Sequence, residues 1–410
     1  MTATDRPEIR AFVAANRERE TALLAALVRT PCDNPPGDLA AAAERVAGLL
    51  EELGFAVERH PVPADLVRAQ GMRSATNLIV RRRYGVGGPV IALNAHGDVV
   101  PPGEGWTADP YGAEIRDGWM YGRGAAVSKS DIAAYAFAML ALDHAQAARR
   151  GAVELHVTFD EETGGEIGPR WLLEQELSRP DLAIGAGFSY AVTEAHNGCL
   201  HLEVEVTGRS AHAAKPWTGI DALEGATRIL SALYAWRPAL AQRASAIPGI
   251  GAPQLTVGLI AGGINTNVVP DRVTFRLDRR IVPEEKPEDA EAELRALIAQ
   301  AARGGPAVSV QVRRILLAAP LTPLPGGLAL TQLLCAHATR VMGEPVTAGG
   351  VPLYTDARHY AAAGVPIALY GAGPRSIEEA NAHRADERLP LDALFKATEV
   401  VAATLADLLA

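Results

Sequence analysis

The chain has 410 residues, of which 48% are hydrophobic and 21% are charged. These fractions are typical of globular proteins and exclude a fibrous or largely disordered chain, and the length favours two domains over a single hydrophobic core. The formal net charge of -9 comes without a basic stripe, which excludes the electrostatic footprint of a nucleic-acid-binding protein and favours a small-molecule partner.

Neither a membrane segment nor a targeting signal is visible in the sequence. No run approaches the roughly 18 apolar residues of a membrane span, and the N-terminal stretch MTATDRPEIRAFVAANRERE lacks the basic-then-apolar order of a signal peptide. We therefore expect a cytoplasmic protein without a membrane partner. Cys32, Cys199 and Cys335 are far apart and form no CxxC pair, so we predict ordinary thiols, with neither a disulfide framework nor a thiolate zinc site.

The first part of the chain, up to about residue 197, alternates helical and strand patterns. Residues 38–55 (DLAAAAERVAGLLEELGF) place Leu and Val at helical spacing and end at a Gly-Phe pair. Short β-rich runs at 77–80, 89–95 and 152–159 are typical of buried strands, and residues 128–147 have the pattern of a helix between two of them. Strand, helix and strand in this order predict an α/β layer.

The middle of the chain has a different pattern. Residues 199–207 (CLHLEVEVT) alternate apolar and polar side chains, as a half-buried antiparallel strand does. A helix, two strands, a helix and a strand follow, at 220–236, 254–260, 272–280, 285–302 and 307–313. The order β-α-β-β-α-β predicts a ferredoxin-like unit.

The α/β pattern then resumes with a helix at 329–341 and an apolar strand at 366–370. The ferredoxin-like unit is therefore expected to interrupt a single α/β domain. The predicted boundaries are a first catalytic part at 1–197, an inserted domain at 198–316 and a second catalytic part at 317–410.

A histidine and a carboxylate follow the predicted strand 89–95. His96 and Asp98 stand two residues apart at its carboxyl end, which is the edge at which open α/β sheets bind ligands. A loop that merely caps the strand is the alternative interpretation of so short a motif.

Three acids, Asp160, Glu161 and Glu162, follow the predicted strand 152–159. Adjacent carboxylates repel unless a cation or a proton separates their charges, although a solvated surface loop would also accommodate them. Glu161 and Glu162 side by side can supply one base and one metal ligand, a pair suited to hydrolysis by metal-bound water. A second histidine, His383, lies in the stretch NAHRADE, beyond the glycine-rich GAG that follows the last apolar strand.

These motifs together resemble those of the family of acetylornithine deacetylase, succinyl-diaminopimelate desuccinylase and aminoacylase, which are zinc-dependent amidohydrolases. HGDVVPPGEGWTADPYGAEIRDGWMYGRGAA resembles the first metal-binding block and DEETGG the catalytic pair. TGRSAH, GGINTNVVPDR and LDRR resemble the inserted domain, and TDARHYAAAGVPIALYGAG and NAHRADE the closing block. The resemblance implies a phosphorylase/hydrolase-like catalytic domain, a mixed sheet flanked by helices, with an inserted ferredoxin-like lid or dimerisation domain, and a homodimer.

The resemblance also implies roles for individual residues. His96, Glu162 and His383 would be metal ligands, and Asp98 would orient His96. Glu161 would be the general base. His212 would stabilise the carbonyl oxyanion. The substrate, including its carboxylate, would be bound by Asn267, Arg280 and Gly373.

The chain departs from the family at two metal ligands. The family has an Asp that bridges two metal ions and precedes a cis peptide, but Val127 stands at that position, and a second acid is missing near Ala186. We therefore hypothesise one ion, zinc with cobalt or manganese as alternatives, on the two-His, one-Glu set of His96, Glu162 and His383. Three nearby groups could substitute for the missing ligands, although a surface or supporting role is favoured for each: Asp131, Glu194 and His196.

The leading prediction is a metal-dependent hydrolase of the amide bond in a small N-acyl or N-carbamoyl amino acid or a short peptide. One alternative is an enzyme of the same fold whose degenerate metal site serves a different or metal-independent reaction on a carboxylate ligand. Another is a non-catalytic binding protein, against which the presence of Glu161, His212 and Arg280 weighs.

Overall fold

The structure is a computed structural model that describes residues 3–305 and 307–410, and the chain forms two compact units. Among these residues no helix has the length and apolar character needed to cross a membrane. Each unit is described by itself. Unit 1 consists of Met1–Glu194, Pro323–Gly349 and Thr355–Ala410, and unit 2 of Ala195–Thr322 and Gly350–Tyr354.

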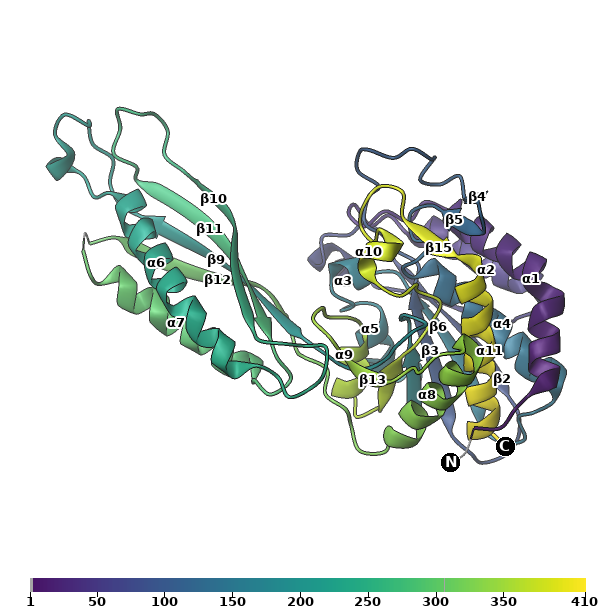
Figure 1. Ribbon diagram of the computed structural model, residues 1–410. Helices are drawn as coiled ribbons and strands as arrows, with labels where there is room; N and C mark the ends of the chain where they lie inside the picture. Colours follow the sequence, from purple (N-terminus) through teal and green to yellow (C-terminus); the bar gives the residue numbers. More distant parts are fainter. Residues whose placement is uncertain (1–2, 306) are drawn as a thin grey trace. The chain divides into compact units, whose positions relative to one another are not determined.

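A mixed sheet flanked by helices forms the centre of unit 1 (Figure 1). Its strand order is β1-β2-β6-β3-β7-β14-β8-β13, with β3 parallel to both β6 and β7 and β2 antiparallel to β6. The predicted α/β class and the predicted strands are confirmed. The strands are β1 (Val57–Pro61), β2 (Thr76–Arg83), β3 (Val90–His96), β6 (Ala152–Thr158), β7 (Leu182–Gly185), β8 (Val192–His196), β13 (Ala348–Val351) and β14 (Ile367–Leu369).

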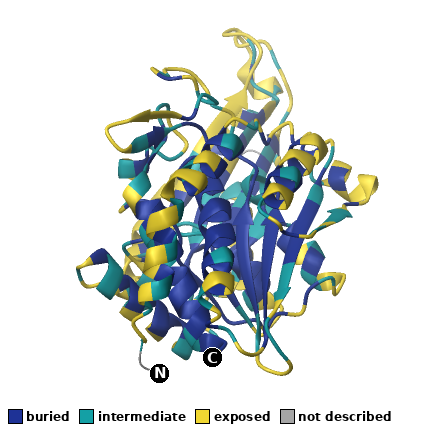
Figure 2. Ribbon diagram, turned by 90° about the vertical axis from the view of Figure 1, so that its right-hand side faces the viewer, coloured by how far each residue is buried: buried dark blue, intermediate teal, exposed yellow. Residues whose placement is uncertain are grey.

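Helices such as α1 and α2 bury one side and expose the other, as the blue and yellow faces in Figure 2 show, whereas α4 and α11 are buried over most of their surface. α4 packs against α1 and α11, and α11 also packs against α8. The helices predicted from sequence correspond to α2, α4 and α8, whereas α1 and α11 were not predicted. The helices are α1 (Pro7–Val28), α2 (Ala40–Glu52), α3 (Ala64–Ala69), α4 (Lys129–Ala145), α5 (Pro169–Glu174), α8 (Leu328–Met342), α9 (Ala357–Ala362), α10 (Ile377–Ala380) and α11 (Leu391–Leu408).

A small antiparallel sheet, also absent from the sequence prediction, completes unit 1. Its order is β15-β5-β4. Each strand is short, with three residues in every case: β4 (Glu114–Arg116), β5 (Trp119–Tyr121) and β15 (Arg388–Pro390).

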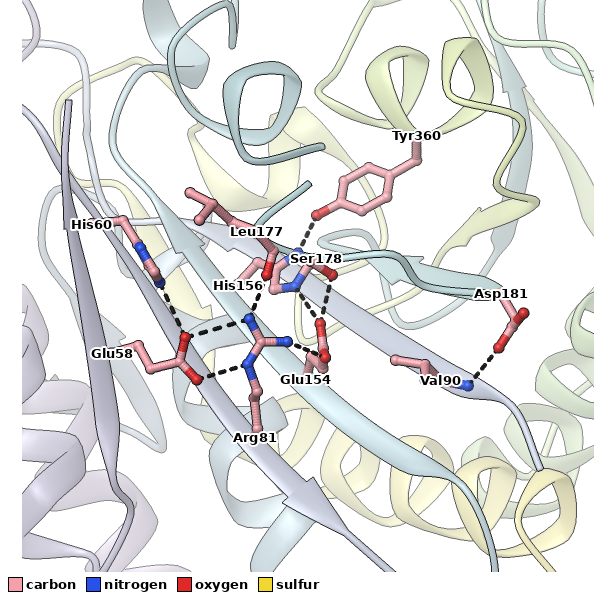
Figure 3. A network of polar contacts seen from close by, with 10 residues as sticks. All are labelled: Glu58, His60, Arg81, Val90, Glu154, His156, Leu177, Ser178, Asp181 and Tyr360. Atoms are coloured by element: carbon pink, nitrogen blue, oxygen red, sulfur yellow. Dashed lines mark hydrogen bonds and ion pairs between the residues drawn. The ribbon is translucent and has the colours of Figure 1, made fainter. Parts of the chain in front are cut away.

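A buried polar network ties β6 to its surroundings in unit 1 (Figure 3). His156 Nδ1 lies 2.7 Å from the Tyr360 hydroxyl, and His156 Nε2 lies 3.3 Å from the Glu154 carboxylate. Burial by itself would raise the pKa of Glu154, but hydrogen bonds from His156 and Ser178 and the charge of Arg81 lower it to about 2. The strand that leads to the predicted catalytic acids is therefore fixed to β2, which carries Arg81, and to α9, which carries Tyr360.

Unit 2 has the ferredoxin-like fold that the sequence predicted. The sheet order is β10-β11-β9-β12, all neighbours being antiparallel, and α6 and α7 cover one face of it (Figure 1). Asp221 caps α6 by accepting hydrogen bonds from two backbone N–H groups of its first turn. The elements are β9 (Gly198–Thr207), α6 (Ala222–Trp236), β10 (Gln254–Gly262), β11 (Arg272–Ile281), α7 (Pro287–Ala302) and β12 (Ser309–Ala318).

Candidate active site

Two neighbouring strands of unit 1 bring the first four predicted site residues together. β3 and β6 run parallel, with His96 in register with the last residue of β6, so the segments that follow them leave the same edge of the sheet. Asp98 lies two residues beyond β3, and Glu161 and Glu162 open the short 3₁₀-helix η1 (Glu161–Thr163) beyond β6. Strand pairing thus joins the two sequence motifs.

Two imidazoles and two carboxylates converge at this edge. Potential ligand atoms of His96, Glu161 and Glu162 all lie within 4.8 Å of one another. His96 Nε2 is 3.9 Å from the Glu161 carboxylate, and His383 Nε2, from the loop after α10, is 3.3 Å from Glu162 Oε1. His383 is 55% exposed in its side chain, so the cluster is open to solvent on that side.

Asp98 supports both motifs. Its carbonyl oxygen lies 2.9 Å and its carboxylate 3.3 Å from His96 Nδ1. Because oxygen acceptors face Nδ1, that nitrogen carries a proton, and Nε2 is the ring nitrogen left facing Glu161. The same carboxylate accepts hydrogen bonds from the backbone N–H groups of Glu161 and Glu162, at 3.2 and 3.1 Å. One buried side chain therefore orients the imidazole and holds the acidic loop.

Three supporting residues were missed by the sequence reasoning. Asn34 Nδ2 donates to the Asp98 carboxylate at 3.0 Å, and its only sequence signal is its place in the turn-forming run CDNPPGD. Arg358 and His359, on α9, contact the carbonyl oxygen of Gly164, His359 at 3.1 Å. They belong to the stretch TDARHY, which indicated the family but not that these two side chains contact the loop after Glu162. These contacts fix the loop that follows Glu162.

Negative charge dominates the site. Burial raises the pKa of Glu161 to about 7, with Glu162 and Asp98 adding to the rise and His96 opposing it. Burial, reinforced by Glu161, raises the pKa of Asp356 well above its ordinary value. Burial opposes a charge on His96, yet Asp98 and the two glutamates raise its pKa well above the ordinary value. The crowding of carboxyl groups in this buried site therefore favours a bound cation among them.

The segment around Val127 contributes backbone contacts to the site. The Val127–Ser128 peptide is cis, and Ser128 Oγ accepts a hydrogen bond from the His96 backbone N–H at 3.2 Å. The Val127 N–H donates to Glu387 at 3.3 Å, and Glu387 pairs with Arg123 at 2.7 Å. The side chain of Val127 is a hydrocarbon and offers no ligand atom.

The three groups considered as substitutes for missing ligands differ in their surroundings. Asp131 is buried, accepts a hydrogen bond from the Ala372 N–H at 2.7 Å, and has its pKa raised by burial to about 7. A Cβ at Gly371 would lie 1.8 Å from the Asp131 carboxylate, which explains the glycine there. His196 is buried against a backbone carbonyl oxygen and Glu194 is half-buried. Within the described residues, the cluster around His96 includes none of the three.

The remaining predicted site residues belong to both units. In unit 2, His212 and Asn267 lie on exposed loops. The two loops are joined by a hydrogen bond of 3.0 Å from the backbone N–H of Ala213 to the carbonyl oxygen of Asn267. Arg280, on β11, is half-buried and donates from Nε to Asp278 at 2.9 Å. In unit 1, Gly373 is buried, and its backbone N–H donates a hydrogen bond of 3.0 Å to the carbonyl oxygen of Gly187 in the loop after β7.

The donor set of unit 1 fits a divalent metal ion. His96 presents Nε2 while its Nδ1 is held by Asp98, and His383 faces Glu162, although His383 lies outside the group of ligand atoms within 4.8 Å of one another that His96, Glu161 and Glu162 form. Two imidazoles and a carboxylate, with a further carboxylate beside them, are the ligands and base of mononuclear zinc hydrolases. Fold and site together define a metal-dependent hydrolase.

Comparisons with known proteins give the family. The model of peptidase family M20/M25/M40 matches residues 92–407. The chain is 30% identical over 390 residues to succinyl-diaminopimelate desuccinylase of Gluconacetobacter diazotrophicus, which covers 92% of this chain and 94% of the relative. It is 31% identical over 349 residues to acetylornithine deacetylase of Proteus mirabilis, with 83% of each chain covered. The chain belongs to peptidase family M20/M25/M40 and is a hydrolase, as the resemblance predicted.

Solved structures of the same family share the fold. A metallo-carboxypeptidase from Sulfolobus solfataricus, described as an M20 family member, superposes with a TM-score of 0.77 at 16% identity, over 94% of this chain and 98% of that one. The YXEP protein of Bacillus subtilis, described as a dinuclear metal-binding peptidase, gives a TM-score of 0.69 at 16% identity, over 97% and 99% of the two chains. At such identities the likeness establishes the fold alone.

Proposed function

We propose that this hydrolase cleaves the amide bond of a small N-acyl or N-carbamoyl amino acid or a short peptide that carries a carboxylate. The observation that carries the proposal is the group of His96, Glu161 and Glu162 at one sheet edge, with His383 beside Glu162. The names of the two relatives, a desuccinylase and a deacetylase, support N-succinyl and N-acetyl amino acids as the first substrates to test.

One metal ion, zinc with cobalt or manganese as alternatives, would be held by His96, Glu162 and His383. When bound, such an ion polarises the scissile carbonyl and lowers the pKa of water. The hypothesis of a single ion rests on Val127 and on the absence of an acid near Ala186. It contrasts with the dinuclear description of the Bacillus subtilis relative, so metal analysis is a direct test of it.

Glu161 is the group that moves the proton. Its carboxylate lies 3.9 Å from His96 Nε2 and is partly open to solvent, and its raised pKa suits a base that accepts a proton from water and returns it to the leaving amine. His212 would stabilise the oxyanion, and Asn267 and Arg280 would bind the substrate carboxylate together with the Gly373 loop. A planar guanidinium suits this task because it can donate two parallel hydrogen bonds to a carboxylate.

Unit 2 would act as a lid and dimerisation domain of a homodimer. The domain boundaries proposed from sequence, at 1–197, 198–316 and 317–410, treat the insertion as one segment, whereas unit 2 of the structure also includes residues 350–354. We further propose a cytoplasmic location.

The deciding experiment replaces Glu161 by Gln and assays a panel of N-succinyl, N-acetyl and N-carbamoyl amino acids and dipeptides. We expect the Glu161→Gln variant to lose at least about 10²-fold in kcat, the lower end for a general base, and removal of metal by a chelator to abolish turnover in the wild type. Glu174→Gln, at an exposed position with a surface ion pair to Arg170, is the matched control and should keep wild-type activity.

Two results would contradict the proposal. Turnover that survives exhaustive chelation would indicate a metal-independent reaction. Tight binding of panel compounds without turnover of any of them would indicate a binding protein.

A further inference from the structure

A second group of potential metal ligands lies in unit 2. Cys199 and His201 on β9 and Asp278 on β11 offer ligand atoms that lie within 4.8 Å of one another. His201 Nε2 is 3.2 Å from Cys199 Sγ and 3.0 Å from Asp278 Oδ2, and Sγ is 3.7 Å from the same oxygen. All three residues belong to the ferredoxin-like unit, whereas His96 and its partners belong to unit 1.

The sheet register explains why these side chains meet. β9 and β11 are antiparallel, with His201 opposite Asp278 and Cys199 opposite Arg280, and residues directly opposite on one face have Cβ atoms about 4.5 to 5.5 Å apart. The alternate residues of β9, from Leu200 to Val206, are fully buried in the core beneath α6 and α7. The three ligands therefore share the sheet face that the helices leave uncovered.

Hydrogen bonds link the three side chains when no ion is bound. A protonated His201 Nε2 can donate to Asp278 Oδ2 at 3.0 Å, and the Cys199 thiol can donate to the same oxygen at 3.7 Å. Once the thiol and Nε2 have lost these protons, sulfur, nitrogen and oxygen offer three lone pairs on atoms that lie within 4.8 Å of one another, and a cation can take the place of the protons.

The spacing of the donor atoms fits a tetrahedral ion. Zinc lies about 2.3 Å from thiolate sulfur and about 2.0 to 2.2 Å from imidazole nitrogen and carboxylate oxygen, so its ligand atoms are roughly 3.3 to 3.7 Å apart. The observed separations of 3.0, 3.2 and 3.7 Å need only small side-chain adjustments.

We propose that Cys199, His201 and Asp278 bind one divalent transition-metal ion, with zinc preferred, and leave a fourth position for water or an anionic ligand. Thiolate and imidazole ligands select such metals over magnesium or calcium. On binding, the thiol loses its proton to solvent and the sulfur becomes the ligand. Cys199 is buried, but the side chains of His201 and Asp278 are 36% and 28% exposed, so an ion can enter from solvent.

Arg280 supports the carboxylate from its other oxygen. Its Nε donates to Asp278 Oδ1 at 2.9 Å, which leaves Oδ2 directed at His201 and Cys199. Such outer contacts orient metal-binding carboxylates. Since Arg280 is proposed above to bind the substrate carboxylate, an ion on Asp278 would fix its orientation.

The test uses the full-length protein reconstituted with Co²⁺, whose thiolate complexes have a sulfur-to-metal charge-transfer absorption. We expect the wild type to have this absorption and Cys199→Ser to lose it together with one bound ion per chain. Cys335→Ser is the matched control, a half-buried cysteine in unit 1, and should retain both. Asp278→Asn tests the site without removing the thiol and should weaken Co²⁺ binding at least about tenfold.

This experiment separates the second site from the proposed active site. Glu162→Gln and His383→Ala should lower metal content at the active site while leaving the thiolate absorption intact, so failure of one site does not imply failure of the other. Absence of the thiolate absorption in the Co²⁺-loaded wild type would overturn the proposal. An unchanged spectrum and metal content in a folded Cys199→Ser protein would do the same.

Discussion

At the scale of single residues, one buried carboxylate organises the active site. Asp98 faces His96 Nδ1 and receives hydrogen bonds from Glu161, Glu162 and Asn34. An amide at this position would turn an N–H₂ group toward at least one of these donors. We therefore expect Asp98→Asn to weaken metal binding about 10- to 100-fold, the usual cost of losing such support, as measured by competition with a chelator. Asp65→Asn, at an exposed position on α3, should leave the affinity unchanged, and equal affinities of the two variants would refute the assigned role of Asp98.

Val127 and Ala186 are the residues on which the single-ion hypothesis depends. Replacing both with carboxylates, as Val127→Asp and Ala186→Glu, should restore the two ligands that the resemblance identifies as missing. We expect the double variant to bind one more ion per chain than the wild type, measured by elemental analysis in the Cys199→Ser background so that the site in unit 2 does not contribute. Two ions per chain in that background without the carboxylates would show that the hypothesis is wrong.

At the scale of secondary-structure elements, sequence prediction succeeded where apolar and polar residues alternate clearly along the chain. β9 was predicted because its buried Leu and Val residues alternate with polar ones, and this alternation also established the ferredoxin-like order. α11 was missed although α4, which is buried over even more of its surface, was predicted, so burial alone does not decide which helices the sequence reveals. Likewise, His96 and Glu161 follow recognisable strands, but the contacts of Asn34 and Arg358 arise from tertiary packing that local pattern does not contain.

The proposed site of Cys199, His201 and Asp278 illustrates the same limit. The sequence contains no CxxC pair, and the prediction of ordinary thiols without a thiolate zinc site followed from that absence. His201 and Asp278 are 77 residues apart in the chain, so only the pairing of β9 with β11 brings them together. A ligand set built across two strands has no local spacing to recognise.

The β6 network leads to a prediction about acid stability. The pKa of Glu154 is lowered to about 2, because contacts from His156, Ser178 and Arg81 outweigh the effect of burial. A carboxyl with a lowered pKa stabilises the fold at pH values above its unfolded pKa of about 4.5, and this stabilisation is lost as the pH falls toward 2. The full contribution is on the order of 3 kcal/mol.

We expect Glu154→Gln to lower the free energy of unfolding at pH 6 and to flatten its decline between pH 5 and pH 3, measured by urea denaturation. The exposed Glu104→Gln should follow the wild-type curve throughout. Parallel pH curves for Glu154→Gln and the wild type would contradict the role assigned to Glu154.

At the scale of the whole molecule, the edge strands of unit 2 carry the expectation of a homodimer. β10 lies at one edge of the four-stranded sheet, and its Leu259 and Ile260 are 60% and 55% exposed. An edge strand with exposed apolar residues is a template for pairing with another chain, and charged residues on such an edge prevent pairing. We therefore expect a dimer in solution and a monomer for the double variant Leu259→Lys, Ile260→Lys, measured by analytical ultracentrifugation. Val86→Lys, which changes a side chain that is 98% exposed in unit 1, should remain dimeric. A monomeric wild type would refute the homodimer, and a dimeric double variant would refute β10 as its interface.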